Sequence, residues 1–163
     1  VDRYLRYAWQ KDSHDAVVLK ARLAFELGQH REVVQLLENN VKETDDVSVS
    51  FVLAAAHYSV ENYKRSAELF EKVYQRCPDN LDVAYNCAQS LMRADKFAQA
   101  VAYFKQCTDV SKYPFASVHT AACLLKNGNV ASGQYMVADL QQQDLQMPVK
   151  LQLAQLQQDF HLA

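Results

Sequence analysis

Apolar side chains recur about every 3.6 positions in two blocks of residues 47–80, which is the spacing of an amphipathic helix. Only residues 60–62 separate the two blocks, and Pro78 follows the second one. A link this short requires two helices to lie antiparallel, and proline ends a helix because it has no backbone N–H to donate. Residues 47–80 are therefore predicted to form a helical hairpin.

The same pattern recurs with a period of 33 or 34 residues, marked by Ala21, Ala54, Ala88 and Ala121. A single hairpin cannot bury its own apolar surface, so copies of it must stack on one another. We predict one all-α domain with repeats over residues 14–46, 47–80, 81–113 and 114–147. An N-terminal helix over residues 1–13 and a C-terminal capping helix over residues 148–163 complete it.

Both terminal segments carry an apolar stripe at helical spacing. The N-terminal stripe comprises Val1, Tyr4, Leu5, Ala8 and Trp9, and the C-terminal one comprises Val149, Leu153, Leu156 and Phe160. The C-terminal helix carries glutamines largely on its other face, as a solvated end helix requires. The N-terminal helix is expected to pack on the first hairpin, either as a cap or as the second helix of a preceding repeat. A homo-oligomer formed through the terminal helices is an open alternative.

The repeats resemble the tetratricopeptide repeat family, whose helix-turn-helix unit has small residues where its helices cross and large apolar residues between units. The resemblance is carried by Ala54, Tyr63, Phe70 and Pro78 in the second copy and by Ala88, Leu91, Phe97, Ala100 and Phe104 in the third. The outer copies depart from it at Val33 and Gly133, where alanine is usual, and at Val130, where an aromatic is usual. The resemblance implies a right-handed superhelix of about four repeats, an α-solenoid.

Composition and charge narrow the possible functions. The 163 residues are 50% hydrophobic and include three glycines and three prolines, too few for the many turns of an all-β fold. The net charge of −2 gives no reason to expect nucleic acid or an anionic membrane as a partner, because both call for a basic surface. The longest apolar run, residues 51–56, is too short for direct membrane insertion. A cytoplasmic location is expected.

The sequence offers no motif for catalysis, for a cofactor or for a metal. It lacks a phosphate-binding glycine loop, a nucleophile elbow and an H-E-x-x-H sequence, so the protein is not expected to be an enzyme. The four cysteines show no C-x-x-C spacing and are predicted to pack in the reduced state, without zinc. His57 and His119 are interpreted as core or boundary residues, with a pH-sensitive contact as the alternative.

In the family that the repeats resemble, the first helix of each pair lines the inner face of the superhelix. Carried over by repeat position, the predicted partner-binding groove comprises Val18, Arg22, Phe25, Phe51, Ala55, Tyr58, Tyr85, Gln89, Met92, Arg93, Phe115, Val118, Leu125 and Lys126. This mostly apolar set, with three basic side chains, suits a peptide that inserts large side chains while its carboxylates or carbonyls pair with the basic groups. The alternative is that neighbouring helices or the terminal helix already cover the groove.

The leading hypothesis is an adaptor or scaffold that holds a peptide or helix of a partner protein in this groove. The family's clamp for chaperone tails uses lysine and asparagine where this chain has Val18 and Ala55, which disfavours a chaperone C-terminal carboxylate as ligand. A second hypothesis is a chaperone of hydrophobic type III secretion translocators, because residues 113–115 and 121–128 resemble the last repeat of those chaperones. A third is a fragment of a longer solenoid in a transport or assembly complex.

Ala88→Leu tests the register of the repeats. The larger side chain would force the two helices of its hairpin apart, and we expect a loss of about 1–3 kcal/mol in the free energy of unfolding. Thermal or denaturant unfolding followed by circular dichroism measures it. An unchanged melting temperature would contradict the register.

Overall fold

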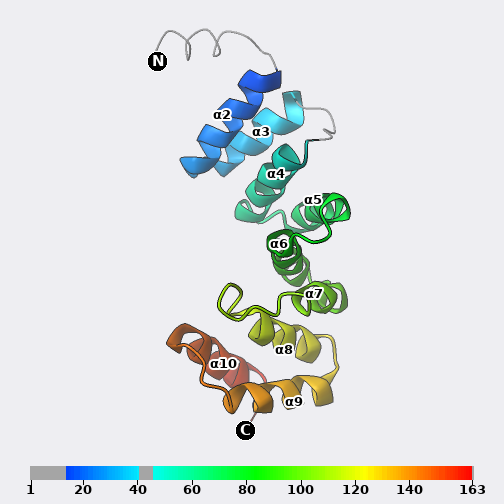
Figure 1. Cartoon of the computed structure of the whole chain (residues 1–163), viewed down its shortest axis with the longest axis vertical. Coiled ribbons are helices and arrows are strands. Elements are labelled where there is room, and N and C mark those ends of the chain that lie inside the picture. Colours follow the sequence, from blue (N-terminus) through cyan, green and yellow to red (C-terminus); the bar gives the residue numbers. More distant parts are fainter. Residues whose placement is uncertain (1–13, 41–45, 163) are drawn as a thin grey trace. The chain divides into compact units, whose positions relative to one another are not determined.

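A computed structural model of the chain describes residues 14–40 and 46–162 (Figure 1). Every regular element in these two ranges is an α-helix. The predicted helix over residues 1–13 lies outside the described residues. Contacts divide the chain into two compact units, residues 1–76 and 77–163, which we call unit 1 and unit 2.

Consecutive helices pair into hairpins within each unit (Figure 1). Unit 1 holds α2 (His14–Glu26), α3 (His30–Asn40), α4 (Val47–Ser59) and α5 (Tyr63–Arg76). Unit 2 holds α6 (Leu81–Arg93), α7 (Phe97–Phe104), α8 (Ala116–Lys126), α9 (Val130–Gln141) and α10 (Met147–Asp159). The pairs α2–α3, α4–α5, α6–α7 and α8–α9 coincide with the four predicted repeats, whose domain boundaries remain a prediction.

The hairpin turns share one backbone device. The second residue of each turn is left-handed, with φ of 73° at Gly28, 64° at Glu61, 59° at Asp95 and 81° at Gly128. The next N–H then donates to the carbonyl five residues back, as from Asn62 to His57 at 2.9 Å, which satisfies a helix-end carbonyl. Glycine adopts this conformation freely, whereas Glu61 and Asp95 do so at a cost of roughly 1–2 kcal/mol each. The turn therefore imposes its geometry even without glycine.

Small residues lie where the two helices of each hairpin cross. Ala21, Ala54, Ala88 and Ala121 on the first helices are all 0% exposed. The second helices bury Val33, Ala67, Ala100 and Gly133 at the same spacing. Ser66 donates a hydrogen bond of 2.8 Å to the backbone carbonyl of Ala54, so the α4–α5 crossing is close enough for a direct side-chain to backbone contact.

The third hairpin departs from the others. Helix α7 has eight residues, whereas α5 has 14, and residues 105–115 connect it to α8 without a regular helix. Within this connection the Asp109 carboxylate accepts hydrogen bonds from the backbone N–H groups of Ser111 (3.0 Å) and Lys112 (3.2 Å). Such local bonds compete with helix formation, and Pro114 has no N–H to continue one. The connection therefore stays irregular up to the start of α8.

Helix α10 closes the C-terminal core of unit 2. Pro148 lies in its first turn, where a missing N–H costs nothing. Its buried side chains Val149, Leu153 and Leu156 form one cluster with Val118 and Leu125 of α8. The helix therefore covers one face of α8.

Gly133→Ala tests the closeness of the α8–α9 crossing. A β-carbon at residue 133 would lie 2.6 Å from Cγ of the buried Leu125 and 3.2 Å from its backbone nitrogen. Alanine favours a helix by about 1 kcal/mol over glycine, but overpacking costs about 1–3 kcal/mol, so a net loss of stability is expected in denaturant unfolding. Ser132→Ala, at an exposed position of α9, is the control and should be neutral or stabilising. A gain in stability for Gly133→Ala would show that the helices have room to spare.

Candidate partner-binding surface

The first helices of unit 1 bring together the predicted groove residues of two repeats. Helix α2 contributes Val18, Arg22 and Phe25, and helix α4 contributes Phe51, Ala55 and Tyr58; together we call them the inner surface of unit 1. All are half-buried except Arg22, which is exposed. Helices α2 and α4 pack against each other, so these side chains belong to one surface.

Arg22 joins the two helices of this surface through Ser48. Its Nη2 donates to Ser48 Oγ at 2.6 Å, and that hydroxyl donates to Asp46 Oδ1 at 2.7 Å. Asp46 also caps α4 by accepting from the N–H groups of Ser48 and Val49. The hydrogen bonds from Ser48 hold the pKa of Asp46 below its ordinary value. The positive charge of Arg22 is thereby fixed at the N-terminal end of α4.

Edge-to-face ring contacts hold the aromatic side chains of the inner surface of unit 1. Phe51 meets Phe70 of α5 at 5.4 Å between centroids, and Tyr58 meets Tyr63 at 5.3 Å. These contacts add to the burial of the rings and set their orientation. The half-buried rings of Phe51 and Tyr58 keep part of their apolar surface open to a partner.

Unit 1 also contains an open cavity of about 740 Å³ at its hairpin turns. It is lined by Gly28, Gln29, His30, Arg31, Glu32, Ser59, Val60 and Glu61. None of the predicted groove residues lines it. Its charged side chains are of both signs, so it does not select an ion of one charge.

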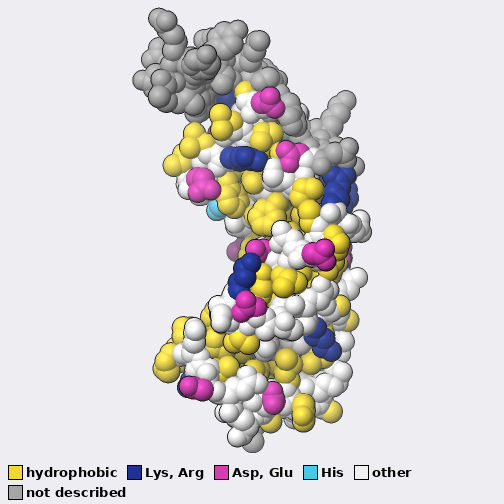
Figure 2. Space-filling model, in the orientation of Figure 1, with side chains coloured by type: hydrophobic (Ala, Val, Ile, Leu, Met, Phe, Trp, Pro, Cys, Tyr) yellow, Lys and Arg dark blue, Asp and Glu magenta, His cyan; other side chains and the backbone are white. Residues whose placement is uncertain are grey.

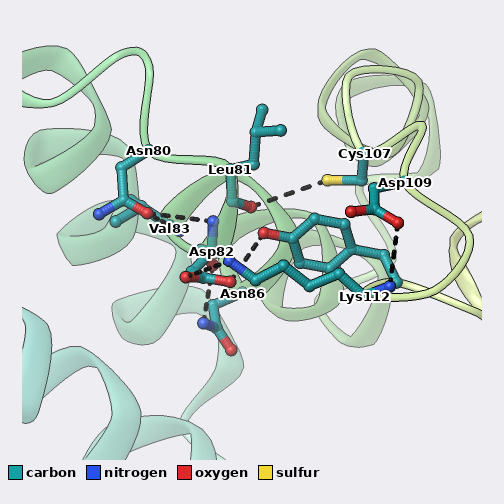
Figure 3. Close-up of polar contacts among 9 residues, drawn as sticks. Asn80, Leu81, Asp82, Val83, Asn86, Cys107, Asp109 and Lys112 are labelled. Atoms are coloured by element: carbon teal, nitrogen blue, oxygen red, sulfur yellow. Dashed lines mark hydrogen bonds and ion pairs between the residues drawn. The ribbon is translucent and has the colours of Figure 1, made fainter.

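In unit 2, Asp82 fastens the irregular connection 105–115 to the start of α6 (Figure 3). Lys112 Nζ donates to Asp82 Oδ2 at 2.9 Å, and Tyr113 Oη donates to Asp82 Oδ1 at 2.7 Å. The thiol of Cys107 also points to the start of α6, with Sγ 3.8 Å from the backbone carbonyl oxygen of Leu81 (Figure 3). The hydrogen bonds from Lys112 and Tyr113 hold the pKa of Asp82 below its ordinary value.

Three of the four cysteines of unit 2, Cys87, Cys107 and Cys123, are buried in the core, whereas Cys77 is half-buried. Burial raises the pKa of Cys107 and of Cys123 to about 11, so both thiols stay protonated at neutral pH. None of the four cysteines forms a disulfide bond. These environments are those of packing residues and not of reactive nucleophiles.

Tyr85 and His119 lie at the centre of a cluster of rings in unit 2. Tyr85 lies 5.1 Å from Tyr113, 5.7 Å from Phe104 and 6.5 Å from His119, measured between ring centroids. His119 lies in turn 5.4 Å from Phe104 and 6.1 Å from Phe115. Its Nδ1 atom is buried without a hydrogen-bond partner, and burial lowers the pKa of the ring while Gln152 of α10 opposes the shift.

The remaining groove residues of unit 2 fall into two groups. On α6, Gln89 and Met92 are half-buried and Arg93 is exposed. On α8, Val118 and Leu125 are only 3% and 5% exposed because they lie in one core cluster with side chains of α9 and α10. These two side chains are therefore part of the core and do not line an open groove, which is the alternative that the sequence left open for this repeat.

Phe115 and Lys126 lie at the two ends of α8. Phe115 occupies the N-cap position before α8 and packs on the core between α8 and α10. The prediction that it belongs to the first helix of the fourth repeat is therefore wrong. Lys126 is exposed, with Nζ 5.6 Å from the centroid of the Phe97 ring. The structure thus leaves the α6 part of the unit 2 groove more open than its α8 part.

Sequence reasoning did not assign the contact of Asp82 with Lys112 and Tyr113. A signal was present, because Asp109 and Pro114 interrupt the helical pattern before the end of the third repeat. His57 was correctly interpreted as a core residue: it is 3% exposed, and its Nε2 lies 3.1 Å from Glu38 Oε1. Burial lowers the pKa of His57, although the nearby Glu38 opposes the shift.

Two kinds of site find no support in the described part of the chain. Residues 14–40 and 46–162 contain no group of three or more His, Cys, Asp or Glu side chains that could hold a metal ion. None of the described helices is long and apolar enough to cross a membrane.

Comparison with known proteins agrees with the architecture. Residues 57–109 match the family model of the tetratricopeptide repeat. The match covers the second half of the second repeat and most of the third, and the predicted all-α solenoid of helical hairpins is confirmed. No curated protein matches the sequence.

Solved structures of MamA proteins share this fold. MamA 41-end from Desulfovibrio magneticus RS-1 has a TM-score of 0.69 at 12% identity, covering 86% of this chain and 83% of that chain. MamA MSR-1 has a TM-score of 0.67 at 19% identity, covering 89% and 85% of the two chains. MamA AMB-1 has a TM-score of 0.63 at 20% identity, covering 99% and 85%. At these identities the likeness concerns the fold alone.

His119→Gln should flatten the pH dependence of stability. Because burial lowers the pKa of His119 in the folded state, the unfolded chain takes up the proton first as the pH falls below about 6.5. Stability is therefore fully present above that pH and decreases below it. Denaturant unfolding of the wild type and the variant at pH 7.5 and pH 5 measures the difference. The control is His161→Gln, at an exposed position of the same unit, and an equal effect of both variants would contradict the assignment.

Proposed function

We propose that the chain is a scaffold that binds a peptide or helix of a partner protein on the first helices of its repeats. A role in protein–protein interaction is the coarse function that the tetratricopeptide repeat family supports. The position of the binding surface and the kind of ligand are inferences from the side chains described above.

One observation carries the proposal. The aromatic residues of the inner surface of unit 1 are only half-buried, although the first helices that carry them bury alanines at their crossing points. Large apolar side chains that lie together on one surface and stay partly open to water are a feature of binding surfaces.

The surface suits a ligand with apolar side chains and a negative or carbonyl-rich end. Phe25, Phe51 and Tyr58 offer ring surface to inserted side chains. Arg22 lies on the same surface with its guanidinium fixed by Ser48, and a guanidinium binds carboxylates and carbonyl oxygens. Figure 2 shows side chains of both charges scattered among hydrophobic ones on the described surface, so no broad field of one sign dominates the face in view.

In unit 2 the same role falls to α6. Helix α10 covers Val118 and Leu125 of α8, and Tyr113 lies beside Tyr85. Met92 and Arg93 remain at the surface of α6. We therefore place contacts of a partner with unit 2 on the C-terminal half of α6.

No specific observation favours the other two functional hypotheses, the secretion chaperone and the fragment of a longer solenoid. No described contact distinguishes a chaperone of secretion translocators from a general adaptor, and the fragment hypothesis concerns sequence beyond this chain. A non-enzymatic role in the cytoplasm belongs to the proposal.

Tyr58→Ala tests the binding surface, with Tyr74→Ala on α5 as the matched control. Both tyrosines are half-buried in unit 1, but only Tyr58 belongs to the inner surface of unit 1. Peptides are first selected from a displayed random library on the wild-type chain, and their affinities are then measured by titration calorimetry. Loss of an aromatic anchor should weaken binding about tenfold, or about 1.4 kcal/mol, whereas the control should retain the wild-type affinity.

Circular dichroism and melting temperature establish that both variants are folded. Equal affinities of Tyr58→Ala and the wild type would remove the inner surface of unit 1 as the binding site. Equal weakening by Tyr74→Ala would mean that the effect comes from stability and not from contact with the peptide.

A further inference from the structure

Three leucines form an exposed stripe on the first hairpin. Leu19, Leu23 and Leu27 follow one another at intervals of four residues and are 52%, 44% and 65% exposed. Residues four apart lie above one another on one side of a helix, and the third leucine immediately follows α2. Hydrophobic side chains gather over α2 in Figure 2. We call these three residues the leucine stripe.

The later repeats show what normally covers this position. Steps of 33, 34 and 33 residues, the same that separate the crossing alanines, take Leu23 to Ala56, Ser90 and Cys123. Each of these three residues is 0% exposed. Leu23 is thus the one member of the series that is open to solvent in the described structure.

In unit 1 the covering element is the second helix of the preceding hairpin. Helix α3 packs on α4, and Ala56 of α4 belongs to the same core cluster as Val33 and Leu37 of α3. Helix α8 likewise packs on the preceding α7. In these later repeats the first helix thus packs, through this face, on the helix that precedes it in the sequence. The leucine stripe lies on the corresponding face of α2.

We propose that residues 1–9 dock on the leucine stripe as an antiparallel helix and cover the end of the first repeat. Val1, Leu5 and Trp9 are spaced by four residues, as are the three leucines, so the two stripes match in length and period. Residues 10–13 provide a link of four residues, similar to the five residues 142–146 between α9 and α10. Leu23 is larger than the alanine, serine and cysteine at its position in the later repeats, so this contact would bury more apolar area at that position than the contacts between later repeats do.

This contact is distinct from partner binding on the inner surface of unit 1. It holds the first repeat in place and removes from solvent an apolar stripe through which two chains would otherwise associate. The occupant is a segment of the same chain, so its binding does not depend on protein concentration.

Trp9 is the only tryptophan of the chain and reports directly on the contact. Its fluorescence is measured in the full-length protein and in a peptide of residues 1–12, together with quenching by acrylamide. We expect emission at shorter wavelength and weaker quenching in the protein than in the peptide. In Leu23→Gln both should move to the values of the peptide, and Leu19→Gln should act in the same way.

Leu151→Gln is the matched control, because Leu151 of α10 is 65% exposed in unit 2 and should leave Trp9 unchanged. Circular dichroism is used to check that each variant keeps the helix content of the wild type. If Leu23→Gln does not fold, Leu19→Gln provides the test. Peptide-like fluorescence of the wild type, or no effect of either leucine variant, would overturn the proposal. Shielding of Trp9 that appears only as the concentration rises, with a dimer in analytical ultracentrifugation, would also overturn it and assign the stripe to a second copy.

Discussion

The close crossing of two helices at a pair of small residues is the constraint on which the structure depends. An alanine that is fully buried at each crossing allows the backbones to approach, and the same approach leaves no space for a β-carbon at Gly133. The left-handed residue of each turn then fixes the direction in which the second helix returns. With crossing and turn both set, every other side chain of a hairpin has a determined face.

The faces of a first helix differ in what they contact. One face of a first helix packs on its own second helix, another can pack on the helix before it, and a third stays partly open. In unit 1 the third face keeps Phe51 and Tyr58 half-open and fixes Arg22 beside them. The partner-binding role proposed for the chain is thus a consequence of how a repeat distributes its apolar residues over three faces.

Unit 2 shows how local departures from the repeat change the available surface. A shortened α7 frees residues 105–115 to fold back, and Asp82 holds them through Lys112 and Tyr113. Helix α10 meanwhile lies on α8 and encloses its apolar side chains. The same repeat pattern therefore leaves α6 more accessible than α8.

The sequence by itself determined the helical hairpins and their register, because a period of 33 or 34 residues with alanine at each crossing admits one arrangement of the two helices. It also identified the side chains of the inner surface of unit 1 by their repeat position. Only the tertiary structure decided which groove residues stay open: Val118 and Leu125 have the same local pattern as exposed positions, but they are buried in one core cluster with side chains of α9 and of the more distant α10. Contacts between distant segments, like that of Tyr113 with Asp82, depend on where the chain returns in space, and no local period encodes that return.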